Sequence, residues 1–403
     1  MSRRRSAHIK GLVLKVTSRC NLNCTYCYVY NKGDTTYKAQ PKRMSDETVE
    51  AILKRVAHYC RRHRLRHFRF IFHGGEPLLL PSSFYEKFVR QAFRLLPSYT
   101  QAVFSLQTNG TLLTADWCQQ LGDWGFRLGF SLDGPPHLHD SYRVDFAGQG
   151  SYHDTIRGLK LAQNHPALPF HPGVLCVIDP TTNPLEVFRH FLSLQVRFLN
   201  FLFPDYTHTS YPWRNAHPAT PLADWLLAVF DDWWQLPSQQ RPYIPYFQHI
   251  IQLILGLASS ADEVGRDAHL FLIIDTDGSI EAQDSLKVCA HGITKEGYNV
   301  TTHSLEEALE APLIQLCAQS HQELPSACRR CPIKEVCGGG FIVHRYHPSN
   351  GFNNPSVYCR DLLKLITHIQ NKLLQRLPVS FVEKAQLAPL SYQEALLQLH
   401  YEA

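Results

Sequence analysis

The stretch CNLNCTYCYVY, residues 20–30, places Cys20, Cys24 and Cys27 at CxxxCxxC spacing. It directly follows an apolar run, residues 12–16, which predicts a buried strand. Three thiolates would then share the loop after that strand. Cysteine thiolates are the usual ligands of iron-sulfur clusters, and a four-iron cube held by three cysteines leaves one iron without a protein ligand. The stretch therefore predicts a cluster with one iron open to chemistry.

The main alternative is a structural zinc site or a chance grouping in a chain with 12 cysteines. Zinc sites, however, usually pair CxxC units and need a fourth ligand close by. The CxxxCxxC spacing, with the aromatic Tyr26 before its last cysteine, resembles the signature of radical S-adenosylmethionine (SAM) enzymes. That resemblance implies that SAM chelates the open iron and is cleaved reductively to a 5'-deoxyadenosyl radical, which abstracts hydrogen from a substrate.

Length, composition and charge limit the classes of protein to which the chain can belong. With 403 residues, 44% of them hydrophobic and 19% charged, the chain is long enough for a large globular domain plus a smaller one. The net charge of +5 is modest, and the run of residues 3–5 is a short basic tail, so we expect no nucleic-acid partner. Without a long apolar run or a secretory signal, we expect no membrane span and a cytoplasmic location, where the cysteines would serve metal or redox chemistry.

Strand-like and helix-like stretches alternate from about residue 10 to 205, which predicts parallel βα units. Six such units form a partial (β/α)6 barrel, the fold that the resemblance also implies, with the active site at the carboxyl ends of the strands. The expected strands are 11–16, 67–72, 102–108, 127–131, 170–177 and 196–201, and the expected helices are 45–61, 81–96, 114–124, 151–163 and 184–194, with Ser45 and Thr114 as N-caps.

Polar motifs follow several of these strands. After the second strand, Gly74, Gly75 and Glu76 belong to an HGGEP turn that resembles the family motif in contact with the methionyl amino group of SAM. The resemblance also implies further SAM contacts, to ribose hydroxyls and to the SAM carboxylate. The residues are Gln107 and Asn109 after the third strand, Ser131 and Asp133 after the fourth, and Arg143 ten residues later. Turn capping and a surface arginine are the alternatives for these last residues.

Residues 206–268 mix tryptophans with long apolar helices, for which core packing is the expected role of the aromatics. A hairpin follows, LIIDTDGSIEAQDS, with Asp277 and Gly278 as its turn. Of the cysteines after it, four lie at ligand spacing, a set that suits either zinc or a fully ligated iron-sulfur cluster. They are Cys328, Cys331, Cys337 and Cys359.

This arrangement resembles the SPASM extension of radical SAM peptide maturases, in which two auxiliary clusters are held by seven or more cysteines. The chain departs from that pattern: Phe341 and Gln283 stand where cysteines are expected, and no cysteine lies between Glu263 and Gly278. We therefore expect one auxiliary [4Fe-4S] cluster beside the SAM-binding one. The other five cysteines have no partner at ligand spacing and are expected to be small buried hydrophobes.

Asp284 matches the aspartate that takes a proton from the substrate in sulfatase-maturing relatives, a task that suits a carboxylate in a cleft. We expect it to be catalytic or, alternatively, a hairpin residue that bonds its own backbone. Further stretches, DTDGSIEAQDSLK and CGGGFIVHRYHPSNGFNNPSVYCRDLLKLITHI, resemble the FxsB-type branch, which includes cyclophane-forming maturases. The implied domains are a radical SAM barrel at 1–205, a helical connection at 206–268, a SPASM-like domain at 269–370 and a helical tail at 371–403.

The resemblance implies radical modification of a ribosomally made precursor peptide, with leader and core, through abstraction of a β-hydrogen and attack of that carbon on an aromatic ring. Flavodoxin or ferredoxin is the expected kind of reductant. The sequence leaves other peptide modifications open, namely another carbon-carbon bond, ring closure on an aliphatic side chain, or epimerisation. A peptide-binding scaffold without catalysis is the alternative outside enzymes, and sulfatase maturation is not expected because the first auxiliary cluster is missing. No separate leader-recognition domain is expected.

Overall fold

The computed structural model describes residues 9–213, 220–259, 261–265, 271–384 and 387–400. Within these ranges the chain forms two compact units. The first comprises residues 1–176, 196–198 and 270–317, and the second comprises residues 177–195, 199–269 and 318–403. The basic run at 3–5, Tyr401 and the expected domain boundary at 268 lie outside the described residues, and the expected domain boundaries stay a prediction.

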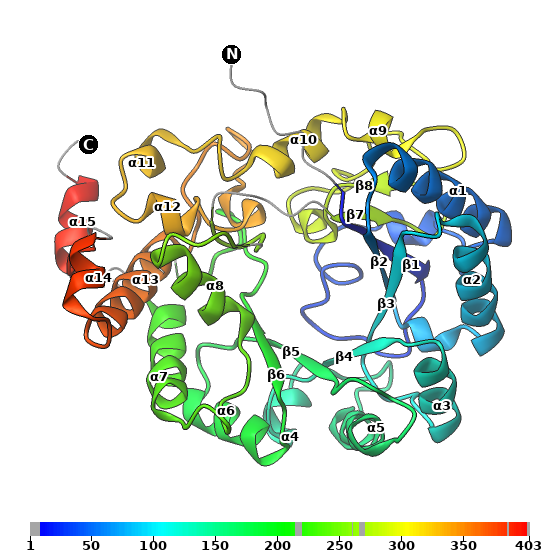
Figure 1. Ribbon diagram of the computed structural model, residues 1–403, viewed down its shortest axis with the longest axis horizontal. Coiled ribbons are helices and arrows are strands. Elements are labelled where there is room, and N and C mark those ends of the chain that lie inside the picture. Colours follow the sequence, from blue (N-terminus) through cyan, green and yellow to red (C-terminus); the bar gives the residue numbers. More distant parts are fainter. Residues whose placement is uncertain (1–8, 214–219, 260, 266–270, 385–386, 401–403) are drawn as a thin grey trace. The chain divides into compact units, whose positions relative to one another are not determined.

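A mostly parallel sheet has the strand order β6-β5-β4-β3-β2-β1-β7-β8 (Figure 1), and most of its strands belong to the first unit. The strands β1 to β5 pair in parallel with their neighbours, and β7 pairs in parallel with the other edge of β1. The predicted alternating α/β fold is confirmed. The strands are β1 (Gly11–Thr17), β2 (His67–Gly74), β3 (Gln101–Thr108), β4 (Arg127–Ser131), β5 (Gly173–Val177), β6 (Phe198–Leu202), β7 (Phe271–Ile274) and β8 (Ile280–Glu281).

Helices of the first unit lie on the outer side of this sheet (Figure 1). Ser45 and Thr114 cap α1 and α3 as predicted, because each side chain accepts a backbone N–H of the first turn, from Thr48 and Trp117. The helices are α1 (Asp46–His63), α2 (Ser82–Leu95), α3 (Ala115–Asp123), α4 (Pro136–His139), α5 (Tyr152–Asn164) and α9 (Leu305–Ala308), with short 3-10 turns η1 (Thr36–Ala39), η2 (Pro77–Leu79) and η3 (Asp284–Val288).

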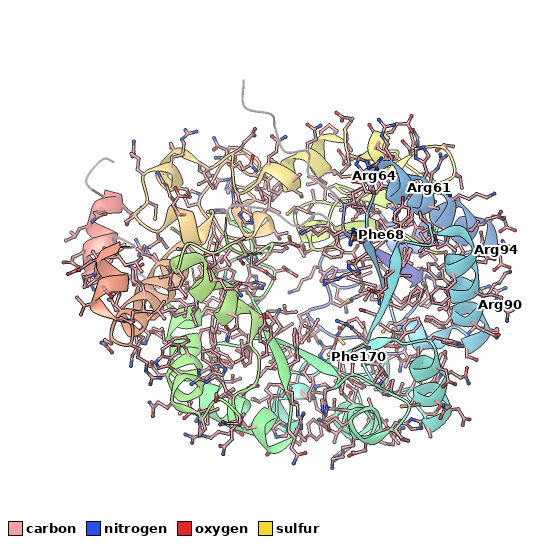
Figure 2. All side chains as sticks on the ribbon, viewed as in Figure 1. Arg61, Arg64, Phe68, Arg90, Arg94 and Phe170 are labelled. Atoms are coloured by element: carbon pink, nitrogen blue, oxygen red, sulfur yellow. The ribbon has the colours of Figure 1, made fainter. Side chains whose placement is uncertain are left out.

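The two faces of β2 have different surroundings. Phe70 and Phe72 stack edge-on against Phe88 of α2, with ring centroids 5.3 and 4.9 Å apart, and both are fully buried. Successive strand residues point to opposite faces, so His73 points away from the helices, to the inner face of the sheet. In contrast, Arg90 and Arg94 project from the side of α2 that faces away from the sheet (Figure 2), as basic residues of a solvated helix face.

The hairpin at 271–281 is present, with Gly278 at φ 84° in its turn. Its first strand continues the sheet of the first unit beside β1, which the sequence did not predict. Pairing between residues some 260 positions apart leaves no local pattern.

The second unit is mainly helical. Trp225 and Trp233 of α7 and Tyr246 of α8 are buried, which confirms core packing for these aromatics, whereas Tyr243 is exposed. Its helices are α6 (Pro184–Ser193), α7 (Pro221–Gln235), α8 (Pro245–Ile254), α11 (Ser326–Arg329), α12 (Lys334–Cys337), α13 (Cys359–Leu374), α14 (Val379–Lys384) and α15 (Tyr392–His400), with a 3-10 turn η4 (Ile342–Arg345); α10 (Pro312–Gln319) spans the boundary between the units. In the described part of the chain, no helix has the length and apolar character needed to cross a membrane.

Candidate active site

The cysteine loop, residues 18–31, follows the carboxyl end of β1. Main-chain bonds fix it to residues 142–145: the N–H groups of Asn23 and Thr25 donate to Val144 and Tyr142 over 2.7 and 3.0 Å. Within the loop, the N–H of Cys27 donates to the carbonyl of Cys24 over 3.0 Å. The cysteines are thus held by backbone bonds that do not depend on their own side chains.

The thiols of Cys20, Cys24 and Cys27 lie close enough to influence one another. Burial, together with the neighbouring Glu76, Cys24 and Cys27, raises the pKa of Cys20 to about 12. Burial also raises the pKa of Cys24 and of Cys27, although Arg143 opposes the effect on both. Grouped thiols whose ionisation is disfavoured by burial are stabilised as thiolates by a cationic metal, so the donor set fits an iron-sulfur cluster.

The HGGEP turn lies directly against the start of the cysteine loop. Gly75 N–H donates to Thr17 carbonyl and Glu76 N–H donates to Arg19 carbonyl, each over 2.9 Å. A Cβ at Gly74 would lie 2.4 Å from the Thr17 oxygen, and one at Gly75 would lie 2.0 Å from the Arg19 oxygen. Glycine is therefore required at both positions, because any side chain would separate the turn from the loop.

The carboxylate of Glu76 is used inside the protein. One oxygen accepts the Leu78 N–H (3.0 Å) and the Thr108 hydroxyl (2.7 Å), and the other accepts the Asn109 N–H (2.9 Å). Burial raises its pKa to about 7 although these bonds favour the charged form. The side chain of Glu76 thus fixes the turn after β3. A contact between the HGGEP motif and SAM stays a prediction, and the backbone of Gly74 and Gly75 is the part of the motif that we expect to make it.

Asn109 and Gln107 both lie at the carboxyl end of β3. The Asn109 amide donates to Asn21 Oδ1 over 2.9 Å, which connects β3 to the cysteine loop. Gln107 Nε2 donates to Ser131 Oγ on β4 over 3.0 Å. A Cβ at Gly129 would lie 2.2 Å from Gln107 Oε1, so this glycine makes room for the amide. The structure brings these predicted residues together, and it adds Asn21 and Gly129, which no sequence pattern marked.

Asp133, Arg143 and Tyr26 form a second group beside the cysteines. Arg143 Nε donates to Asp133 Oδ2 over 2.7 Å, and the Tyr26 hydroxyl donates to the same oxygen. The Arg143 guanidinium lies 5.3 Å from the centre of the Tyr26 ring and has Nη1 4.0 Å from Cys24 Sγ. His139 supports the group by accepting the Asp133 N–H over 3.3 Å, and burial lowers its pKa to about 4, which keeps it neutral. Asp133 and Arg143 thus bind each other rather than standing free for separate ligand groups.

Asp284 begins η3 directly after the hairpin and is 7% exposed. Its Oδ1 accepts a charged hydrogen bond of 3.2 Å from Lys15 Nζ. The sequence analysis missed Lys15, although a signal was present: it is the one charged residue between apolar neighbours in the first strand. A cation inside a buried strand needs a buried partner, because an unpaired charge is costly there.

The four late cysteines, all in the second unit, influence one another's ionisation. Burial is the main cause of the raised pKa of Cys337, and Cys359, Cys331 and Cys328 all add to it. The pKa of Cys359 is raised to about 12 by burial and then by Cys328 and Cys331, and that of Cys328 to about 11. Four neighbouring thiols fit a fully ligated cluster. The following residues 338–340 all have positive φ, between 59° and 81°, which explains the run of three glycines.

The other five cysteines are separate from both groups in sequence. Cys60, Cys118, Cys176 and Cys317 are buried as predicted, whereas Cys289 is half-buried. Within the ranges that the structure describes, no three His, Cys, Asp or Glu side chains converge on the position of a single metal ion.

The class of protein follows from this geometry and from a family comparison. Residues 14–171 match the model of the Radical SAM superfamily. This part of the chain is therefore similar to radical SAM domains, and the chain is an enzyme of radical SAM type chemistry. Its three early and four late cysteines supply the donors that SAM-binding and auxiliary [4Fe-4S] clusters would need.

Individual relatives are similar over most of the chain. A cysteine-type anaerobic sulfatase-maturating enzyme of Clostridium perfringens is 28% identical over 378 residues, which cover 90% of this chain and 96% of that protein. The solved structure of native anSMEcpe with bound AdoMet and a Kp18Cys peptide superimposes with a TM-score of 0.78 at 24% identity, covering 93% of this chain and 99% of that one. Streptococcus suis SuiB bound to precursor peptide SuiA shares the fold with a TM-score of 0.56 at 14% identity, covering 88% and 76%.

Proposed function

We propose that the enzyme is a maturase of a ribosomally made precursor peptide and joins an aromatic ring carbon to the β-carbon of a nearby residue. The observation that carries this proposal is the pair of cysteine groups, three thiols after β1 and four in the second unit. Relatives named for sulfatase maturation support action on a polypeptide. The stretches around Asp284 and Cys337 resemble the cyclophane-forming branch and support the finer assignment.

The first cysteine group would hold the cluster that binds SAM. When bound, SAM and the clusters supply the hydrogen-abstracting radical and the electron acceptor. The residues around the loop would bind and orient SAM: the Gly74–Gly75 backbone, the Gln107–Ser131 pair, and the Asp133–Arg143 pair beside Tyr26. Their mutual hydrogen bonds hold these polar groups in place before a ligand arrives, which lowers the cost of binding.

The crosslink balances when the peptide loses two hydrogens. One leaves the β-carbon as an atom, and the aromatic carbon loses the other as a proton together with one electron. Asp284, a buried carboxylate at the end of the hairpin, is the proposed proton acceptor. The site of Cys328, Cys331, Cys337 and Cys359 is the proposed electron-accepting centre, and flavodoxin or ferredoxin the proposed source of the electron that cleaves SAM.

Co-expression with the peptide encoded by the short open reading frame beside the gene tests the proposal. Mass spectrometry should show the loss of two hydrogens per crosslink, and fragmentation should fail between the two joined residues. A chain with Cys20, Cys24 and Cys27 changed to alanine should leave the peptide unmodified. An unchanged mass with the intact enzyme contradicts the crosslink, and uptake of one deuterium per residue in heavy water would identify epimerisation instead.

Maturation of a sulfatase is a second candidate, because several relatives carry that name at 25–28% identity. Gln283 and Phe341, in place of two expected cluster cysteines, speak against it. The discriminating measurement is the activity of a sulfatase co-expressed with this enzyme, which we expect to stay at the level of the sulfatase alone.

A further inference from the structure

Lys15 lies on the inner face of the sheet. Its neighbours Leu14 and Val16 are fully buried on the other face, and Lys15 stands in register with His73 of β2. Paired residues of adjacent parallel strands point to the same side, and His73 points away from the helices. Lys15 therefore projects, from the strand that leads into the cysteine loop, to the face of the sheet opposite the helices.

The ammonium group of Lys15 is buried and has an acidic surrounding. The residue is 3% exposed, and its Nζ lies 3.2 Å from Asp284 Oδ1. Burial opposes its charge, but Asp284, Asp275 and Glu281 more than compensate, so the pKa of Lys15 is raised above its usual value. A buried ion pair is weak evidence for stability, because apolar residues of similar volume are often at least as stable in its place.

The other two acids have partners of their own. Lys295 Nζ lies 3.1 Å from Asp275 and 2.6 Å from Glu281, and Lys287 Nζ lies 3.2 Å from Glu281. Across the described residues, Lys15 is the cation in contact with Asp284. Asp275 and Glu281 thus have lysines of their own at contact distance, while the Lys15–Asp284 pair joins two elements 269 residues apart.

His73 completes the arrangement. Its Nδ1 accepts the Gly74 N–H over 2.8 Å, and this bond leaves Nε2 as the free end of the ring. Burial and the charge of Lys15 lower its pKa, while Asp284 raises it, and the net effect is a lowered pKa. The imidazole of His73 thus lies next to Lys15 in the sheet, and the charge of Asp284 acts on its pKa.

We propose that Lys15 is a positioning residue that fixes the Asp284 carboxylate in place at the inner face, so that this carboxylate can take the proton released when the peptide crosslink forms. This inference rests on the proposed function, since it assigns Asp284 as the acceptor. Lys15 itself transfers no proton. It fixes the acceptor oxygen at the end of β1, the same strand that leads into the cysteine loop.

The test compares variants of the full-length enzyme co-expressed with the peptide of the neighbouring reading frame. Two quantities are measured, 5'-deoxyadenosine released and modified peptide formed. Lys15→Met should lower the modified peptide about 100-fold, the usual contribution of an oriented acid-base group, and leave release of 5'-deoxyadenosine within about threefold. Lys15→Arg keeps the charge and should recover part of the loss. Lys295→Met, which removes a cation from the hairpin but not from Asp284, should lower the melting temperature without changing the ratio of the two products.

A double-variant cycle separates positioning from a role in folding. Lys15→Met alone leaves Asp284 buried and unpaired, whereas Lys15→Met with Asp284→Asn removes both charges and should fold as the wild type does. If Lys15 acts through Asp284, the double variant is no less active than Asp284→Asn alone. The inference would be overturned if Lys15→Met formed as much modified peptide as the wild type. It would also be overturned if the double variant formed less modified peptide than Asp284→Asn alone, by the factor that Lys15→Met loses. A wild-type enzyme that modifies no peptide would instead refute the proposed function.

Discussion

Arg143 and Asp133 form a buried ion pair, with Nε 2.7 Å from Oδ2 and side chains 11% and 5% exposed. Asp133 follows β4, and Arg143 follows α4, close to the residues that hold the cysteine loop. Burial opposes the charge of the guanidinium, but Asp133 outweighs this effect and raises the pKa of Arg143. The pair therefore connects one strand end of the sheet to the cysteines.

Replacing Arg143 by Met should leave Asp133 charged and unpaired in the interior. We expect the free energy of unfolding to fall by about 3–5 kcal/mol, the usual cost of breaking a buried pair, and SAM affinity to fall with it. Urea unfolding and equilibrium dialysis with SAM measure both quantities. Arg90→Met is the matched control, since its pair with Glu86 is exposed and should contribute under about 1 kcal/mol. Equal effects of the two substitutions would contradict the account.

Gly129→Ala should disturb SAM binding without unfolding the protein. The added methyl group would lie 2.2 Å from Gln107 Oε1, the far end of a flexible side chain that can move away. That movement breaks the 3.0 Å bond to Ser131, worth about 1 kcal/mol, so SAM affinity should drop roughly fivefold. Gly125→Ala is the control, because that position has φ +71° and open space around it: it should cost stability alone. An unchanged dissociation constant for Gly129→Ala would count against Gln107 as a SAM contact.

The buried Glu76 should make stability depend on pH. Its pKa is about 7 in the folded chain and 4.5 in the reference state, so the folded state binds the proton more tightly. Stability from this group is therefore highest below pH 4.5 and decreases as pH rises toward 7, by up to about 1.4 kcal/mol per pH unit. Thermal unfolding of the wild type and Glu76→Gln across this range measures the difference. A gap between the two proteins that does not change with pH would show that the carboxylate titrates normally.

The second cysteine group should be separable from SAM cleavage. With Cys328, Cys331 and Cys359 changed to alanine, iron per chain should fall from about eight atoms to about four, because one of two four-iron clusters is lost. We expect 5'-deoxyadenosine release to persist and peptide crosslinking to stop. Cys60→Ala, at a fully buried position without metal, should change neither quantity. If this triple variant no longer released 5'-deoxyadenosine, the SAM-cleaving site and the second cysteine group would not be independent.

Local patterns sufficed for most of the sheet and helices. The six predicted strands appear as β1 to β6, and only the fifth begins clearly later than expected, at Gly173 instead of residue 170. Phe170 is 42% exposed, and Pro172 has no N–H for the ladder, so the apolar residues before Gly173 do not join the sheet. The cysteine spacings likewise predict two groups of thiols, and their role as cluster ligands stays a prediction.

Contacts between distant segments were beyond the sequence. Nothing near Lys15 indicates that its partner lies 269 residues away, because charge pairing depends on the fold and not on spacing. The ligand contact expected of the motif at Glu76 stays a prediction, and no sequence pattern indicated the three donors of the protein itself that bind its carboxylate. The sequence shows which polar side chains a site contains, and only the folded chain shows which of them form hydrogen bonds or ion pairs with one another.

Release of 5'-deoxyadenosine from SAM tests the central claim most directly. Protein reconstituted with iron and sulfide without oxygen, then given SAM and dithionite, should release it, and a chain with Cys20, Cys24 and Cys27 changed to alanine should release none. Absence of 5'-deoxyadenosine from the intact protein, or equal release by the alanine variant, would contradict the assignment of these cysteines as the site of SAM cleavage.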